Sequence, residues 1–189
     1  MTIYLVRHTE YANPENIFAF HLPLVLSEKG ERHAERVGEW FKQQEVSEIN
    51  IFSSPIKRTM QTAEIISQKI NSHIFTDDRL IESYCPNLQG KKQPAVDAWK
   101  EECSDSSRET VEECQKRMLD IFLEKVKTNQ DCILVSHGDP LTSLYYYLIS
   151  KPLVHCLFDE EHIDIYIKRG EIIKVITHDN GYSVERFSA

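Results

Sequence analysis

The sequence predicts an α/β protein built on a mixed β-sheet, because short apolar strands alternate with amphipathic helices along most of the chain. The first strand covers residues 2–6, which are apolar, rich in β-branched and aromatic types and free of helical spacing. A buried strand cannot continue through Arg7 and His8, so these side chains should emerge at its carboxyl end. Ligands of open α/β sheets bind at that edge.

The composition is that of an ordinary globular protein and fits a single domain over residues 1–189. No apolar run is long enough to span a bilayer, and the N-terminus lacks the pattern of a signal peptide, so we expect a cytoplasmic protein without a membrane partner. The net charge of −8 argues against nucleic acid as a partner, because binding to the phosphate backbone needs a broad basic face. A few converging Arg and His residues can still make a pocket for an anionic small molecule.

The cysteines predict buried free thiols. Their number is odd and no C-x-x-C spacing occurs, which disfavours a disulfide framework or a structural zinc site. They are Cys85, Cys103, Cys114, Cys132 and Cys156. The eight histidines include no H-x-x-x-H pair, so no metal site is expected.

The segment after the first strand predicts a long loop and then a helix. Residues 9–26 lack periodicity and contain an Asn-Pro turn signal and a second proline, so we expect them to cover part of the fold. Ser27 can cap the helix that follows, in which small and apolar residues recur at spacings of three and four.

A second strand is expected over residues 48–53, again followed by a helix. Ser54 and Pro55 are a preferred N-cap and first helical residue, and the helix should continue to about residue 70. Arg58 falls in the first turn of this helix, off its apolar stripe. It therefore also lies near the carboxyl end of a strand.

The middle of the chain is less regular. Residues 73–76 are expected to form a third strand, whereas residues 83–107 are polar and aperiodic, which is typical of a functional or mobile loop. Thr110 and Glu113 fit a capping box at the start of the next helix.

A further buried strand over residues 132–135 ends just before His137, and Asp139-Pro140 should start the helix that follows. Near the C-terminus, residues 162–168 alternate strictly between apolar and polar side chains. Arg169-Gly170 then reads as a turn, with residues 172–177 as the antiparallel partner strand. This hairpin is predicted to form the edge of the sheet.

The turns after three strands thus carry cationic or imidazole side chains, namely Arg7, His8, Arg58 and His137. Two of these turns lie beside helix N-termini, which attract anions through free N–H groups and the helix dipole. Guanidinium groups bind phosphate oxygens bidentately. The set therefore suits a dianionic phosphoryl group.

An imidazole within such a set can also act as a nucleophile towards phosphorus and split hydrolysis into two easier steps. The neighbouring cations would stabilise the charge on the transferring oxygens. The leaving alkoxide then needs a proton from a carboxyl group. Spacing alone leaves four candidates open, which are Glu10, Asp78, Glu82 and Asp139.

Three motifs resemble those of the histidine phosphatase superfamily, in its phosphoglycerate mutase-like branch. They are LVRH at residues 5–8, SSPIKRTMQTAE at residues 53–64 and VSHG at residues 135–138. Their order and spacing match the family from residue 3 to about residue 150. The resemblance implies a three-layer α/β/α sandwich with a mostly parallel central sheet, and chemistry that needs no metal and no cofactor.

The resemblance also implies roles for individual residues. His8 matches the nucleophile that becomes phosphohistidine. Arg7, Arg58 and His137 match the groups that bind phosphate around it. Residues 80–82 match the family's Leu-x-Glu segment, which makes Glu82 the expected proton donor and later the base for water.

The sequence departs from the family pattern at several positions. Thr9 stands where a glycine usually follows the Arg-His pair, and Asn13 lies one position from the usual asparagine, which leaves it a candidate substrate-binding residue. Residues 21–24 read His-Leu-Pro-Leu in place of an Arg-Leu-Pro-Gly segment. Ser83 stands where mutases carry an arginine that holds the substrate carboxylate.

The expected function is hydrolysis of a phosphomonoester through a phosphohistidine on His8. The alternatives are a phosphoglycerate-type mutase and a non-enzymatic protein that recognises phosphate. The expected partner is a phosphorylated small molecule, with a phosphoprotein as a further option. Sugar phosphates, nucleotides and phosphoglycerate all fit this chemistry, and the sequence assigns no oligomeric state.

Overall fold

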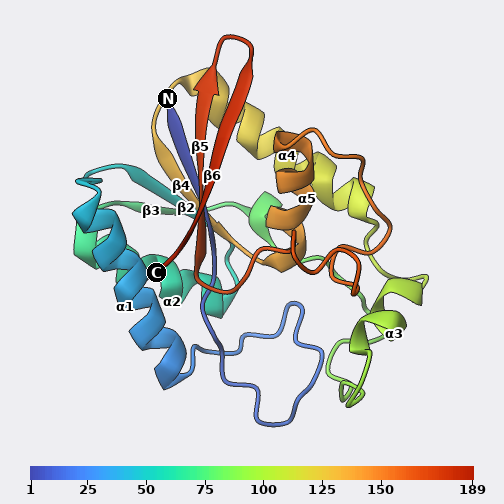
Figure 1. Cartoon of the computed structure of the whole chain (residues 1–189). Coiled ribbons are helices and arrows are strands. Elements are labelled where there is room, and N and C mark those ends of the chain that lie inside the picture. The colour runs from blue at the N-terminus through green and yellow to red at the C-terminus, as the bar shows by residue number, and fades with distance from the viewer.

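The computed structural model describes all 189 residues, and Figure 1 shows the order of the elements. The strands are β1 (Thr2–Arg7), β2 (Asn50–Ser53), β3 (Ile74–Thr76), β4 (Cys132–Ser136), β5 (Glu171–His178) and β6 (Gly181–Ser188). The helices are α1 (Glu28–Gln43), α2 (Lys57–Ile70), the short 3-10 helix η1 (Asp78–Leu80), α3 (Ala98–Ser104), α4 (Val111–Thr128) and α5 (Gly138–Leu148).

All six strands form one sheet in the order β3-β2-β4-β1-β5-β6. The first four strands of the chain run parallel, whereas β5 and β6 are antiparallel and form one edge. Helices α1 and α2 lie on one face of the sheet and α4 and α5 on the other (Figure 1). The predicted three-layer α/β/α sandwich, mostly parallel with an antiparallel edge, is confirmed.

Strand β1 lies between the two layers of helices and contributes to both hydrophobic cores. Ile3 and Leu5 pack in the core under α4 and α5, and Tyr4 and Val6 pack in the core under α1 and α2. Successive side chains of a strand point to opposite faces, so a strand covered on both faces needs apolar residues at every position. This explains the continuous apolar run at the start of the chain.

Two predicted helix caps are confirmed. The hydroxyl oxygen of Ser27 accepts a hydrogen bond of 3.1 Å from the backbone N–H of Gly30 at the start of α1. At the start of α4, the Thr110 hydroxyl accepts from the backbone N–H of Glu113, and the Glu113 carboxylate accepts from that of Thr110. Both helices therefore begin with satisfied backbone donors.

Two other predicted helix starts are wrong. Helix α2 begins at Lys57 rather than at Pro55, and the Ser54 hydroxyl instead lies 2.9 Å from the Nε2 atom of His137. Helix α5 begins at Gly138, one residue before Asp139. In both cases the polar side chain that would have capped the helix makes a contact elsewhere in the fold.

The predicted hairpin partner at residues 162–168 is also wrong. This segment is a series of turns, in which the carbonyl of His162 accepts hydrogen bonds from the N–H groups of Ile165 and Tyr166. Strand β5 pairs instead with β6, which the sequence analysis did not predict. The antiparallel edge exists, but it is built from residues 171–188.

The two predicted irregular segments pack on each other. Phe18 and Phe20, from the loop after β1, form a small core with Cys85 and Leu88. The segment from residue 83 to 107 contains one short helix, α3, which the sequence did not predict. Together these segments cover the carboxyl ends of the parallel strands.

The prediction of free thiols is right for three cysteines and wrong for two. Cys85, Cys114 and Cys132 are free and buried. Cys103 of α3 forms a disulfide bond with Cys156, from which it is separated by 53 residues. The sequence carried no signal for this pair, because the folding of the chain, and not any local spacing, brings the two Cα atoms to 5.8 Å.

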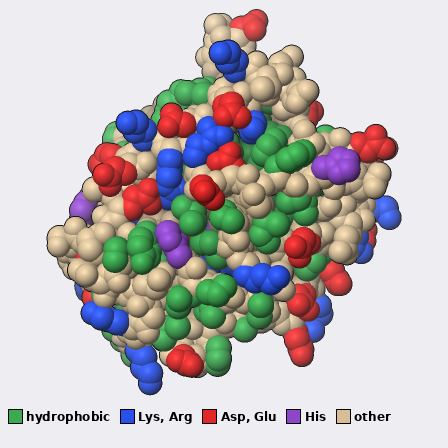
Figure 2. Space-filling model, turned by 180° about the vertical axis from the view of Figure 1, so that it is seen from behind, with side chains coloured by type: hydrophobic (Ala, Val, Ile, Leu, Met, Phe, Trp, Pro, Cys, Tyr) green, Lys and Arg blue, Asp and Glu red, His purple; other side chains and the backbone are tan.

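The surface is mixed in charge. On the face shown in Figure 2, acidic and basic side chains are interspersed among apolar ones. None of the helices is both long enough and apolar enough to cross a bilayer.

Candidate active site

The carboxyl ends of three parallel strands meet at one pocket. Register places Arg7 of β1 beside Ser136 of β4, and the backbone N–H of His8 donates to the carbonyl of Ser136. The N–H of Ser54, just after β2, donates to the carbonyl of Val135. The three motifs of the sequence analysis therefore converge on one place. The pocket there has a volume of about 170 Å³.

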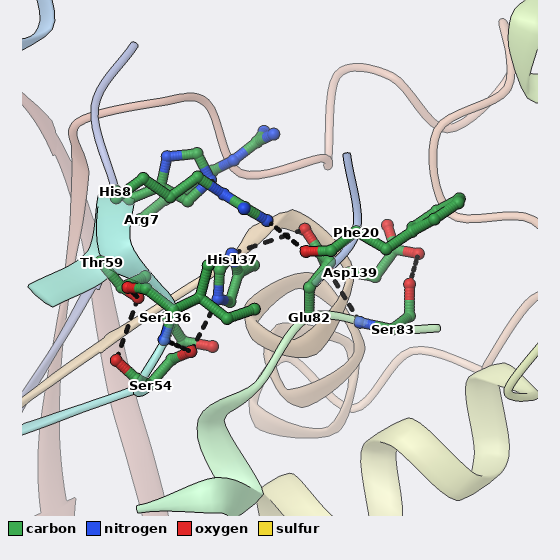
Figure 3. Close-up of polar contacts among 12 residues, drawn as sticks. Arg7, His8, Phe20, Ser54, Thr59, Glu82, Ser83, Ser136, His137 and Asp139 are labelled. Carbon is green, nitrogen blue, oxygen red and sulfur yellow. Dashed lines mark hydrogen bonds and ion pairs between the residues drawn. The ribbon is translucent and has the colours of Figure 1, made fainter. Parts of the chain in front are cut away.

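His8 is almost completely buried, and its two ring nitrogens have distinct partners. Nδ1 lies 2.7 Å from the carbonyl oxygen of Thr9, which can only accept a hydrogen bond. Nε2 accepts from the Nε–H of Arg58 at 3.2 Å. The proton is therefore on Nδ1, and the unprotonated Nε2 is held by Arg58 in a ring that lines the pocket. Figure 3 shows His8 beside Arg7 and His137. Burial, followed by the charge of Arg58, lowers the pKa of His8 well below its usual value, so the imidazole is neutral.

Arg58 is buried and fixed by backbone carbonyls of the loop after β1. Its Nη2 donates to the carbonyl of Phe20 at 2.8 Å, and its Nη1 donates to those of Ala19 and Leu22. The loop thus holds the guanidinium against His8. A charged group so far from water is stable here because nearly all of its N–H donors have partners.

Arg7 flanks the pocket from the end of β1. Its Nη1 donates to the carbonyl of Ile167 at 2.7 Å, and its guanidinium lies over the ring of Tyr166. Its buried Nε has no hydrogen-bond partner. The close packing explains the glycine of the third motif, since a Cβ atom on Gly138 would lie 3.0 Å from Cζ of Arg7 and 2.0 Å from the hydroxyl of Tyr166.

His137 is fully buried at the start of α5, and the centre of its ring lies 5.1 Å from that of His8. Its Nε2 contacts the Ser54 hydroxyl, whereas its Nδ1 has no hydrogen-bond partner and lies 3.7 Å from Oε2 of Glu82. Burial, followed by the charge of Arg58, lowers the pKa of His137 well below its usual value. An unpartnered polar atom at a helix N-terminus is suited to contact an anion.

Glu82 lies between the imidazoles and the other side of the pocket (Figure 3). Burial, followed by the negative charge of Asp139, raises the pKa of Glu82 to about 7. The charges of Arg58 and Arg7 act in the opposite direction but do not prevail. The carboxyl group is therefore protonated in a large fraction of molecules near neutral pH, as a general acid must be.

Opposite His8 the pocket is acidic. We call the lining carboxyl groups of Glu82, Glu102 and Asp139 the acidic side of the pocket. Arg108 does not line the pocket but contacts Glu102 and Asp139. Asp139 accepts hydrogen bonds from the Ser83 hydroxyl, from Tyr166 and from Arg108. It is therefore fully engaged as an acceptor, and its role is to hold these three side chains in place.

The structure brings together most of the residues predicted for the site. Arg7, His8, Arg58 and Glu82 line the pocket, and His137 packs directly behind it. Of the other carboxyl groups, Asp139 lines the pocket, but Glu10 and Asp78 do not. Glu10 instead bonds to Ser27 and Lys29 at the start of α1.

Asn13 does not line the pocket. Its side-chain amide donates to the carbonyl of Ile17 and accepts from the N–H of the same residue. Both hydrogen-bonding ends of the amide are thus used within the loop after β1.

The departures from the family pattern are accommodated locally. Thr9 is fully buried, its hydroxyl donates to the carbonyl of Gly30 at 2.8 Å, and its backbone does not adopt the left-handed conformation that favours glycine. His21 stacks on the ring of Tyr84, and its Nε2 lies 2.9 Å from the carbonyl of Glu82. His21 thus contacts the backbone of the proposed acid.

Several pocket residues were missed in the sequence analysis. Tyr11, Tyr166 and Arg169 lie beside Arg7 and Arg58, and Glu102 belongs to the acidic side. None follows a strand in a recognisable motif. The sequence contained one signal for Glu102, which is its place in the long irregular segment of residues 83–107. Such segments in compact domains are often functional.

Three ligand atoms of His8, Glu82 and His137 lie within 4.8 Å of one another, which is close enough for a metal ion. The guanidinium groups of Arg7 and Arg58 flank the same point, and their positive charges repel a cation and attract an anion. The electrostatics of this pocket therefore favour a phosphoryl group over a metal.

The chain belongs to the histidine phosphatase superfamily, because residues 3–188 match its branch 1. A 2,3-bisphosphoglycerate-dependent phosphoglycerate mutase of Thermoplasma acidophilum is 30% identical over 155 residues, which cover 78% of this chain and 72% of that one. Phosphoserine phosphatase 1 of Hydrogenobacter thermophilus is 30% identical over 166 residues, covering 79% and 76%. The solved structure of Bacillus stearothermophilus YhfR has the same fold, with a TM-score of 0.81 and 23% identity over 97% of this chain and 94% of that one.

Proposed function

We propose that this protein is a phosphatase that hydrolyses a small phosphomonoester through a phosphohistidine on His8. The observation that carries the proposal is the buried neutral imidazole of His8, which lines the pocket beside two guanidinium groups and has its unprotonated Nε2 bonded to one of them. The volume of about 170 Å³ also supports a small substrate, since pockets for drug-sized ligands measure roughly 300–1,000 Å³.

In the first step, Nε2 of His8 forms a bond to phosphorus as the bond to the leaving oxygen breaks. The Nε–H of Arg58 then shifts from Nε2 to a phosphoryl oxygen, and Arg7 and His137 bind the other oxygens. Glu82 gives its proton to the leaving oxygen, so the product departs as a neutral alcohol. The carbonyl of Thr9 holds the Nδ1 proton and stabilises the positive charge on the phosphorylated ring.

In the second step, the Glu82 carboxylate takes a proton from water while the water oxygen forms a bond to phosphorus. The bond between phosphorus and Nε2 breaks, and inorganic phosphate leaves. Glu82 is then protonated again and His8 is neutral again, so the site returns to its starting state. A pKa near 7 suits a group that acts as acid in one step and base in the next.

Hydrolysis is favoured over mutase activity by the surroundings of Ser83. Its hydroxyl donates to Asp139 at 2.7 Å, at the position where the resemblance places an arginine in mutases. A phosphoglycerate would therefore face carboxylates where it needs a cation for its own carboxylate. A mutase is still a relative of this chain, so flux from 3- to 2-phosphoglycerate with a bisphosphate primer should be measured beside hydrolysis.

The decisive experiment traps the intermediate. The protein is mixed with a ³²P-labelled phosphomonoester, quenched in alkali and tested for the acid-labile, alkali-stable label of a phosphohistidine. We expect label in the wild type and in His73→Ala, which changes an exposed histidine, and none in His8→Ala. Turnover of 4-nitrophenyl phosphate should be lost in parallel. Label that persists in His8→Ala would refute the mechanism.

A further inference from the structure

The acidic side of the pocket contains one carboxyl group that the proposed reaction does not use. Glu102 lies on α3 and lines the pocket, and its side chain is only 12% exposed. Its nearest cation is Arg108, whose Nε lies 3.5 Å away, but these two groups do not form a hydrogen bond. Glu102 thus faces the pocket as an acceptor without a donor.

Arg108 does not neutralise the acidic side. Its Nη2 is hydrogen-bonded to Asp139, its side chain is 5% exposed, and its Nε has no hydrogen-bond partner. One guanidinium therefore serves two carboxyl groups. The arginines that do line the pocket lie towards His8, where Arg169 packs over the ring of Tyr11.

This charge distribution selects among leaving groups. Phosphate bound at His8 would direct the alcohol part of the substrate past Glu82 towards the acidic side. A carboxylate there would meet Glu102 and Asp139, whereas an ammonium group would give Glu102 its missing donor and a counter-charge. Burial, followed by the charge of Asp139, raises the pKa of Glu102 although the charge of Arg108 acts in the opposite direction. A cation bound in the pocket would therefore favour the ionised form of Glu102.

We propose that Glu102 recognises an ammonium group on the leaving alcohol, so that the preferred substrates are phosphomonoesters of small amino alcohols. This inference rests on the proposed phosphatase function and adds the substrate class to it. Glu102 is a specificity residue in this scheme, since it contacts the part of the substrate that leaves.

The test compares two substrates of nearly equal size and opposite charge, phosphoethanolamine and phosphoglycolate. We expect the wild type to favour phosphoethanolamine in kcat/KM by at least tenfold. Glu102→Gln should reduce this ratio by about tenfold or more, because the amide removes the negative charge. Glu101→Gln, which makes the same change at an exposed neighbour on α3, should keep the wild-type ratio.

Calorimetric binding of both compounds to His8→Ala, which cannot turn them over, gives the same comparison without catalysis. The inference would be overturned if the wild type had equal kcat/KM and equal affinity for the two compounds. It would also be overturned if the ratio of the two kcat/KM values were unchanged in Glu102→Gln. If the wild type hydrolyses 4-nitrophenyl phosphate through a labelled His8 but does not discriminate, only the inference fails. If no label forms, the phosphatase proposal fails, and the binding preference still decides whether Glu102 recognises an ammonium group.

Discussion

At the scale of single residues, the arrangement of charge around Glu82 separates two roles that carboxyl groups can play in one pocket. Asp139 has three donors and acts as a fixed acceptor, whereas Glu82 accepts only from the backbone N–H of Ser83. The ionised neighbour and the burial together keep a proton on Glu82. The difference between the surroundings of Asp139 and Glu82 thus identifies Glu82 as the expected general acid.

This assignment predicts how activity depends on the leaving group. For an alkyl phosphate, Glu82→Gln should lose roughly 10²–10⁴-fold in kcat/KM, which is the usual contribution of a general acid. For 4-nitrophenyl phosphate the loss should be much smaller, because nitrophenolate leaves without a proton. Steady-state kinetics with both substrates checks this, and Asp78→Asn, outside the pocket, is the control. Equal losses on both substrates would contradict the role.

The same residue should also set the alkaline limb of the pH profile. Because the pKa of Glu82 is about 7, kcat/KM of the wild type for an alkyl phosphate should fall as the pH rises above that value. In Glu82→Gln this fall should be absent. The second ionisation of the substrate, near pH 6, lies below this limb.

The residues that the sequence could predict are those that follow strands in motifs. Arg7, His8, Arg58 and His137 are placed by the strand ends, and the family resemblance selected Glu82 from four carboxyl groups. The remaining pocket residues come from loops whose course depends on tertiary contacts. Glu102, for example, lines the pocket from α3, a helix that no pattern in the sequence predicted.

At the scale of elements, local signals were reliable where the other contacts of a capping side chain left its oxygen free to accept. Ser27 and Thr110 cap their helices as predicted, because each hydroxyl donates to a carboxylate and still accepts from a backbone N–H. Ser54 has the imidazole of His137 as an alternative partner, and α2 starts three residues later. The alternation of apolar and polar residues at 162–168 led to a wrong prediction of a strand. In the structure the backbone of this segment forms turn hydrogen bonds instead of strand pairing.

The capping box of α4 allows a quantitative test. Thr110→Ala removes the acceptor for the N–H of Glu113 and should lower the free energy of unfolding by about 1 kcal/mol. Thr110→Ser keeps the hydroxyl and should recover most of this loss. Urea denaturation measures both, with an unchanged m-value expected. If the alanine variant were as stable as the wild type, the cap would contribute nothing measurable to α4.

At the scale of the whole molecule, the groups that make the site work also oppose its stability. A folded-state pKa of about 7, against an ordinary value of 4.5, means that unfolding releases a proton from Glu82 between these two pH values. Stability from this group is therefore highest below pH 4.5, falls as the pH rises towards 7 and is level above it. The buried imidazoles have the opposite effect, because they lose stability as the pH drops below 6.5.

The effect of Glu82 on stability can be isolated by comparing the free energies of unfolding of Glu82→Gln and the wild type. The free energy of unfolding of Glu82→Gln minus that of the wild type should grow by up to a few kcal/mol between pH 5 and pH 8. Urea titrations at several pH values measure it, and the imidazoles cancel to first order because both proteins contain them. A difference that does not change with pH would mean that Glu82 titrates normally in the folded state. Glu82→Gln should thus be less active than the wild type on alkyl phosphates yet more stable at alkaline pH.

The bond between Cys103 and Cys156 links helix α3, which carries Glu102, to the segment that carries Phe158 of the same pocket. A preparation handled with dithiothreitol and one handled without it are therefore two covalent forms of this protein. Both forms contain His8 and the pocket arginines. Only the oxidised form has a covalent bond between α3 and the segment that carries Phe158. Rate constants from the two preparations should be compared only after the thiols have been counted.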